Sequence, residues 1–193
     1  NWEGAVDNGR NATSRIKLAL RTLLNSKSLS RITVAELCRE AGVSRTAFYG
    51  NYSNTYQAFR DLADDFLCNS DNLYEHLRGL THKRSGERVY PLCELLRNSG
   101  EYRGLVSDPE FEKVLLYSDN PLRRQYLRYF VRNGASEQDA ASLFLFQVSG
   151  CYRIALEDLP EDQWRRRKEA VDRYVHAGIG CVLSASDEDE PSE

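Results

Sequence analysis

The sequence predicts an all-α protein of about nine helices. Apolar residues recur at helical spacing along most of the 193-residue chain, and no stretch alternates apolar and polar residues in the manner of a strand. The charge is divided: residues 1–60 hold nine Lys/Arg and four Asp/Glu (net +5), whereas residues 61–193 hold 17 and 25 (net −8). A small basic part and a larger acidic part predict two helical domains with different partners.

The first helix signal lies after residue 12. Ile16, Leu20, Leu23 and Leu24 fall on one side of a helix, with basic residues off that side. Residues 1–12 precede this pattern, and we expect them to form a flexible arm.

Two short helices are predicted next. Thr33 and Glu36 have the spacing of a capping box, in which Thr33 is the N-cap of a helix that stops near Gly42. Ser44 can cap a third helix, from Arg45 to about Asn51. The residues spaced to pack these helices on each other and on the first helix are Leu37, Cys38, Ala41, Val43, Phe48 and Tyr52.

Capping residues, prolines and glycines divide the rest of the chain. Asn54 or Thr55 can begin a fourth helix. Gly100 and Gly134 are predicted helix stops. The prolines that suit the first turn of a further helix are Pro91, Pro109 and Pro121.

The segment from Thr33 to Tyr52 has the physical features of a helix-turn-helix. Gly42 lets the chain reverse between the two short helices with a positive φ. Polar, Arg and Tyr side chains left pointing outward can reach base edges and phosphates in a major groove. A structural helical hairpin would explain the apolar spacing. It would not explain the capping box, the turn, the exposed tyrosine and the basic flank together, so the segment predicts DNA binding.

These residues resemble the DNA-binding domain of the tetracycline-repressor (TetR/AcrR) family of bacterial regulators. The family pattern ITVAEIAREAGVSRGTFYRHFPSKEALL is matched closely at 32–37, 41–45 and 48–49, within a segment from about Ser14 to Phe66. The resemblance implies a cytoplasmic, all-α homodimer, associated with the nucleoid when bound. Its three N-terminal helices would bind a double-stranded DNA operator. Its C-terminal domain would hold the dimer interface and a pocket for an unknown small-molecule effector.

The resemblance and the outward-facing positions together give a set of candidate DNA-binding residues, which are Thr33, Ser44, Arg45, Thr46, Ala47, Tyr49, Asn51 and Thr55. Four positions that bear on DNA contact depart from the family pattern. Ala47 replaces the usual Thr, Gly50-Asn51 replaces Arg-His, and Thr55 replaces the Lys that opens the fourth helix. Typical contacts to the DNA backbone are therefore weakened or lost, and we expect a modest affinity or an unusual site.

We divide the chain into a DNA-binding domain at 13–53, a ligand-binding and dimerisation domain at 54–185 and a disordered acidic tail at 186–193. The stretch from Phe144 to Gly150, followed by Cys151–Leu159, resembles an F-x-x-x-G run in a subgroup of the family. Some members of that subgroup activate dihydroxyacetone-utilisation genes or act as coactivators that no longer bind DNA. A ligand-responsive repressor is the predicted function, and a coactivator or interaction protein without DNA binding is the alternative.

Two sets of residues are candidates for the C-terminal sites, although ordinary core packing would also explain them. Aromatic residues in the middle of the chain suit an apolar cavity, because a phenol offers apolar area plus one hydrogen bond. The candidate pocket residues are Phe66, Tyr90, Tyr102, Phe111, Tyr117, Tyr126 and Phe130. The last two helices, at 137–158 and 162–184, are the predicted dimer faces. Their candidate interface residues are Phe146, Gly150, Ile154, Tyr174, Gly178 and Cys181.

Other classes of function lack their sequence signals. The chain has no glycine-rich phosphate loop and no nucleophile motif. Its five cysteines and three histidines lack the spacing of metal ligands, and we expect the cysteines to be reduced. No 18-residue apolar run predicts a membrane-spanning helix. The sequence therefore predicts no enzyme, cofactor, metal site or membrane partner.

Overall fold

The computed structural model describes residues 2–68 and 92–184, and side chains from residue 11 onward. The described residues are helical with turns and contain no strand, which confirms the all-α prediction. None of their helices is long and apolar enough to cross a membrane. The Pro91 helix start and the acidic tail lie outside the described residues.

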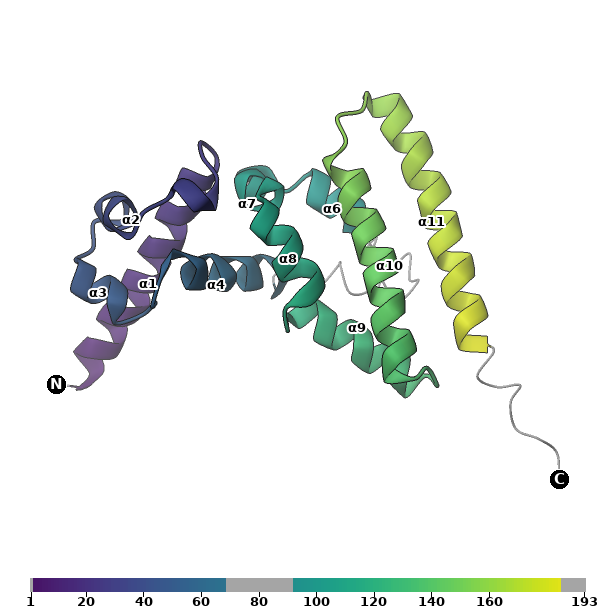
Figure 1. Cartoon of the computed structure of the whole chain (residues 1–193), viewed down its shortest axis with the longest axis horizontal. Coiled ribbons are helices and arrows are strands. Elements are labelled where there is room, and N and C mark those ends of the chain that lie inside the picture. Colours follow the sequence, from purple (N-terminus) through teal and green to yellow (C-terminus); the bar gives the residue numbers. More distant parts are fainter. Residues whose placement is uncertain (1, 69–91, 185–193) are drawn as a thin grey trace. The chain divides into compact units, whose positions relative to one another are not determined.

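The chain forms two compact units, which are residues 1–66 with 99–114, and residues 67–98 with 115–193. The first unit contains the N-terminal helices (Figure 1). Its elements are α1 (Trp2–Leu24), η1 (Leu29–Arg31), α2 (Val34–Ala41), α3 (Arg45–Tyr49), most of α4 (Thr55–Cys68), η2 (Gly100–Tyr102), α7 (Arg103–Ser107) and the start of α8 (Pro109–Tyr117). The second unit contains the end of α8 with α6 (Leu92–Arg97), α9 (Pro121–Arg132), α10 (Glu137–Leu156) and α11 (Glu161–Ser184).

Helix α1 is the centre of the first unit, and both α2 and α3 pack on it (Figure 1). Ile16 and Leu20 are fully buried there, together with Leu37 of α2 and Phe48 of α3. The helix starts at Trp2, so it includes nearly all of the segment that the sequence predicted as an arm. Residues 1–12 contain no proline, so no residue there removes a backbone donor that the helix needs.

The first unit extends beyond the predicted boundary at residue 53. The Lys17 ammonium lies 2.5 Å from Asp65 and 3.3 Å from Asp61, which ties α4 to α1. Residues 99–114 also belong to this unit, because Asp108 accepts a hydrogen bond from the Leu29 amide (2.8 Å). Gly104 permits the close packing of α7 on α1, since a Cβ there would lie 2.4 Å from the backbone of Leu24.

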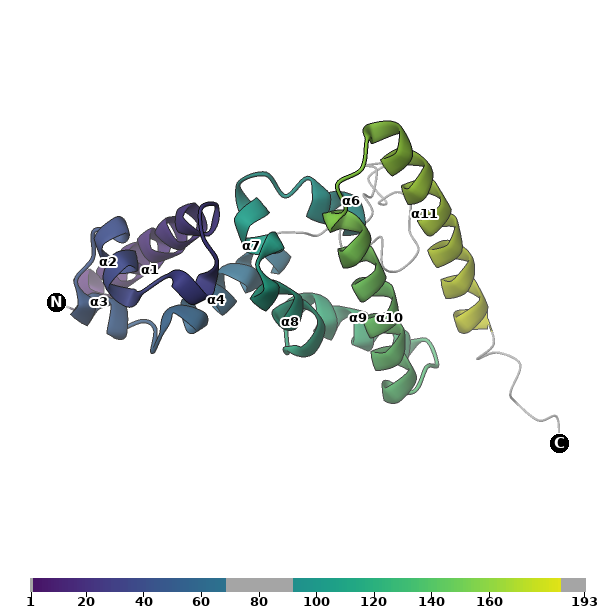
Figure 2. The same cartoon turned by 45° about the horizontal axis from the view of Figure 1, so that its top comes forward.

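In the second unit α10 packs against α6 and α9 (Figure 2). Asn120 accepts a hydrogen bond from the Arg123 amide (2.9 Å), and Pro121 follows it, so α9 begins as predicted. Helix α10 ends at Leu156, two residues before its predicted end. The Arg97 guanidinium fixes the turn that follows, because it donates to the carbonyls of Glu157 and Leu159 (2.7 and 2.8 Å).

Candidate nucleic-acid interface and ligand cavity

The turn between α2 and α3 is held by glycine geometry. Gly42 has φ 61° and ψ 38°, the left-handed conformation in which other residues are strained. A Cβ at Gly42 would lie 2.4 Å from Nη2 of Arg15. Arg15 donates from the same Nη2 to the Gly42 carbonyl (2.6 Å), so the turn is bonded directly to α1.

Two hydroxyl caps fix the starts of the short helices. Thr33 Oγ1 accepts from the Glu36 amide (3.2 Å), and Ser44 Oγ accepts from the Ala47 amide (3.0 Å). Only the Thr33 half of the predicted capping box is formed. The Glu36 carboxylate, which would complete it, pairs with Lys27 instead (2.5 Å). Thr33 and Ser44 therefore shape the site as caps, and both remain exposed.

Helix α3 presents three of the predicted residues to solvent. Arg45 and Thr46 in its first turn are exposed, and Tyr49 is 58% exposed with its ring edge-on to buried Phe48 at 5.5 Å. No hydrogen bond or ion pair among the described residues occupies the Arg45 guanidinium. Ala47 is half-buried, so it offers little contact area. This short helix has the side chains needed for bidentate base contact and for a phosphate contact.

Asn51 does not face outward as predicted. Its Oδ1 accepts from Thr13 of α1 (3.0 Å), and its Nδ2 donates to the Ala47 carbonyl (2.7 Å). The reason is that α3 ends at Tyr49, and the chain then turns back toward α1. Asn51 therefore connects α3 to α1. Thr55 is half-buried as the first residue of α4, and Asn54 Oδ1 caps that helix.

The positive charge of this unit is partly neutralised within the unit itself. Lys17 pairs with Asp61 and Asp65, and Lys27 pairs with Glu36. The buried Tyr52 hydroxyl also donates to Asp61 (2.6 Å), and burial together with that carboxylate raises the pKa of Tyr52. The exposed cations of the two short helices and their flanks are Arg31, Arg39 and Arg45. Of these, the sequence motif singled out only Arg45.

The seven candidate pocket residues do not form one lining. In the first unit Phe66 contacts Tyr102 and Phe111, with ring centroids 5.2 and 5.9 Å apart, and this cluster is ordinary packing. Tyr117 is 71% exposed at the end of α8. Tyr90 lies outside the described residues. Spacing along the sequence could not separate these groups, because helical periodicity gives only the buried side of each helix.

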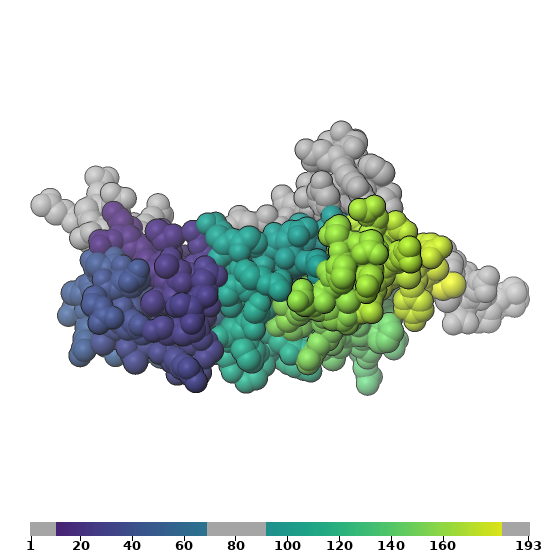
Figure 3. Space-filling view, turned by 90° about the horizontal axis from the view of Figure 1, so that it is seen from above, coloured from purple at the N-terminus to yellow at the C-terminus, as the bar shows by residue number. Residues whose placement is uncertain are grey.

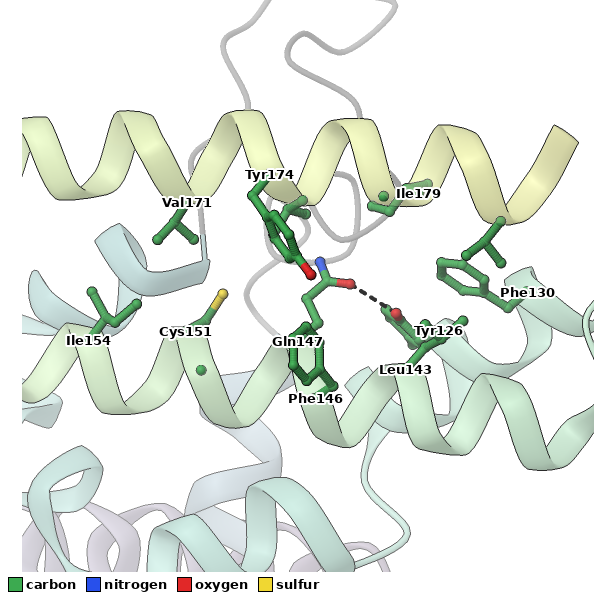
Figure 4. A pocket seen from close by; sticks show the side chains of 14 residues that line it. Tyr126, Phe130, Leu143, Phe146, Gln147, Cys151, Ile154, Val171, Tyr174 and Ile179 are labelled. Atoms are coloured by element: carbon green, nitrogen blue, oxygen red, sulfur yellow. Dashed lines mark hydrogen bonds between the residues drawn. The ribbon is translucent and has the colours of Figure 1, made fainter. Parts of the chain in front are cut away.

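A cavity of about 390 Å³ lies in the second unit, between α9, α10 and α11 (Figure 4). It contains two of the candidate pocket residues, Tyr126 and Phe130, which stack with centroids 4.5 Å apart. The predicted interface residues that also line it are Phe146, Gly150, Ile154, Tyr174 and Gly178. Cys181 is exposed and outside the lining. The residues predicted as a dimer face are thus brought together with pocket residues around one cavity.

The cavity has a buried floor and an exposed rim. Tyr126 and Cys151 are 1% and 2% exposed, whereas Phe146 and Tyr174 are 67% and 65% exposed, with their rings 6.4 Å apart. Both α10 and α11 lie at the surface in the space-filling view, in green and yellow (Figure 3). Gln147, which the sequence did not single out as a pocket residue, accepts a hydrogen bond at Oε1 from the Tyr126 hydroxyl (2.8 Å). No group of three or more potential metal ligands occurs among the described residues.

Comparison with known proteins finds solved structures that are similar to this chain. A TetR variant from Acinetobacter baumannii AYE, solved in complex with minocycline, is similar with a TM-score of 0.43 and 15% sequence identity. The similarity covers 92% of this chain and 97% of that chain. No protein-family model matches the chain, and neither does any curated protein sequence.

Proposed function

We propose that the protein is a transcription regulator that binds double-stranded DNA through α3. The observation that carries this proposal is the exposure of Arg45, Thr46 and Tyr49 on a helix fixed by the Ser44 cap and the Gly42 turn. In its first turn, an arginine can donate two parallel hydrogen bonds to guanine O6 and N7. The motif's resemblance to the TetR/AcrR family supports the same function.

We further propose a cytoplasmic homodimer that acts as a ligand-responsive repressor. The cavity of the second unit supports an effector site, because its volume suits a small molecule. The exposed aromatic pair, Phe146 and Tyr174, supports a dimer contact at the rim, since exposed apolar groups of this size tend to mark interaction surfaces. A second copy packed on this rim would leave the floor of the cavity to a ligand.

A coactivator that does not bind DNA is the second candidate function. It is favoured because several hydrogen-bond donors of the first unit that could bind DNA are already bonded within the protein. Asn51 is bonded to Thr13 and Ala47, and Lys17 is paired with two aspartates. Thr55 also lacks the charge that the family pattern has at that position.

Selection of DNA sites from random duplexes by the purified full chain distinguishes the two functions. Arg45→Ala should weaken binding by about 1–3 kcal/mol and relax the preference at one base pair. Tyr49→Phe should weaken all sequences alike, because its hydroxyl would reach a phosphate. Matched controls in the second unit are Arg132→Ala and Tyr117→Phe, which alter exposed side chains of the same kinds. Neither control should change DNA affinity.

The outcomes separate cleanly. Unchanged selectivity for Arg45→Ala, or altered selectivity for Tyr49→Phe, would show that the two roles are assigned wrongly. If the unmutated protein enriches no sequence at all, the coactivator function replaces the proposed one.

A further inference from the structure

Two buried cysteines of the second unit lie against each other. Cys93 is in α6 and Cys151 is in α10, and these two helices pack together. The two thiols share a hydrogen bond, and the Cys93 backbone amide also donates to the Cys151 sulfur. Neither cysteine is part of a disulfide. The fold therefore brings two reduced thiols into contact in the core from distant positions in the sequence.

Only one of the two thiols borders the α9–α10–α11 cavity. Cys151 lines that cavity, and Figure 4 shows its sulfur directed away from α10, toward α11. Cys93 is not among the described lining residues, and it is 0% exposed where Cys151 is 2% exposed. A small molecule in the cavity can therefore meet Cys151, whereas Cys93 is reached only through Cys151.

The surroundings of the pair restrict its chemistry. A zinc site needs three or more protein ligands, and the described residues bring no such group together. The hydrogen bond with Cys93, together with burial, raises the pKa of the Cys151 thiol well above its usual value. The thiol therefore stays protonated at neutral pH and reacts slowly with reagents dissolved in water. The described lining is mostly apolar and carries no charged side chain, so it concentrates a neutral, apolar reagent beside the thiol.

We propose that Cys93 and Cys151 are a modification site at which an apolar organic hydroperoxide forms a disulfide between α6 and α10. In the first step the Cys151 sulfur loses its proton and attacks the terminal oxygen of the hydroperoxide. The O–O bond breaks, which leaves a sulfenic acid on Cys151 and an alcohol that takes up the proton. In the second step the Cys93 sulfur attacks the Cys151 sulfur, the S–O bond breaks, and the hydroxide leaves as water with the Cys93 proton. The two sulfurs lose two electrons, and the hydroperoxide is reduced to alcohol and water.

The contacts of the pair support this order of steps. The Cys93 amide, which donates to the Cys151 sulfur, stabilises the ionised sulfur that the first step needs. A sulfenic acid condenses with a thiol within reach, and the Cys93 thiol is already in contact. The inference goes beyond the proposed regulator, because the modification requires neither DNA nor a non-covalent effector.

The test exposes the purified, reduced full chain to cumene hydroperoxide and maps its disulfides by mass spectrometry. Trypsin places Cys93 in the peptide 89–97 and Cys151 in the peptide 133–153. We expect these two peptides to be joined with the loss of two hydrogen atoms. Without reductant, the product should still migrate as a single chain.

A comparison of two oxidants tests the role of the cavity. The rate of disulfide formation is divided by the rate at which the same oxidant oxidises N-acetylcysteine, which removes the intrinsic reactivity of each oxidant. This relative rate should be at least about tenfold higher for cumene hydroperoxide than for hydrogen peroxide, because only the apolar oxidant is concentrated in an apolar cavity.

Three variants assign the roles of the two thiols. Cys93→Ala should stop at the sulfenic acid, which dimedone traps on Cys151. Cys151→Ala should leave Cys93 unoxidised, because Cys93 does not reach the cavity. Cys38→Ala is the matched control, since it removes a buried cysteine of the first unit and should leave the disulfide and its rate unchanged. If a variant fails to fold, the disulfide map and the relative rates of the unmutated protein still decide the question.

Several results would overturn the inference. Oxidation confined to the exposed Cys68 and Cys181, or no oxidation at all, would make Cys93 and Cys151 ordinary core residues. Equal relative rates for the two oxidants, or oxidation of Cys93 in Cys151→Ala, would also contradict it. A failure of DNA binding in the selection experiment would leave the disulfide unaffected, so the two proposals fail separately.

Discussion

Replacement of Gly42 by alanine is the sharpest test of how α3 is held. A residue other than glycine in the left-handed conformation costs about 1–2 kcal/mol. The new Cβ would also displace the Arg15 guanidinium, which lies 2.4 Å from its position, and break the bond to the Gly42 carbonyl. Loss of such a bond costs about 0.5–1.5 kcal/mol. We therefore expect Gly42→Ala to destabilise the turn by about 1.5–3.5 kcal/mol.

Hydrogen exchange of the backbone amides in α2 and α3 measures this locally, without assuming that the two units unfold together. The expected destabilisation corresponds to exchange that is roughly 10- to 300-fold faster. Gly100→Ala is the matched control, because Gly100 also has a positive φ (57°) but no atom within 4 Å of the added Cβ. It should show only the backbone strain at its own site.

The comparison can refute the reasoning in two ways. If Gly42→Ala leaves the exchange of α2 and α3 unchanged, the turn does not depend on glycine. If Arg15→Ala adds its full effect to that of Gly42→Ala, the two changes are independent and the Arg15 contact is not what the alanine disrupts.

Three other predictions concern charge, ionisation and assembly. Raising salt from about 50 to 200 mM should weaken DNA binding by about tenfold, as expected for some two phosphate contacts from basic residues of the first unit, and a salt-independent affinity would contradict this. The pKa of Tyr52 is raised in the folded protein, so its neutral form stabilises the first unit. This stability is fully present below the unfolded pKa near 10.0 and is lost as the pH rises from there through the folded pKa. Alkaline unfolding should therefore be less steep in Tyr52→Phe, and identical pH profiles would exclude the effect. Light scattering at micromolar concentration should show a dimer, and the double variant Phe146→Ser with Tyr174→Ser should be a monomer. In the dimer bound to DNA, the two copies of α3 should lie about 34–36 Å or a somewhat larger step apart. A monomeric unmutated protein would exclude the dimer.

Local sequence signals were sufficient for the helix-turn-helix. Caps at Thr33, Ser44 and Asn120 depend on residues at most three positions apart, and the structure has all three. The apolar spacing also identified Leu37 and Phe48 as core. These features are decided by short-range sterics and hydrogen bonding, which is why they can be read without a tertiary structure.

Features that depend on distant segments came only from the tertiary structure. Nothing near Asn51 in the sequence shows that Thr13 would bond its side chain and turn it from the predicted interface. Gly104 could not be connected with Leu24 without the packing of α7 on α1. Likewise, an apolar face on α10 predicts burial but not whether a ligand or another chain covers it. The structure placed Gln147 and Tyr126 together at a cavity floor, because the relative positions of helices far apart in sequence decide which buried side chains meet.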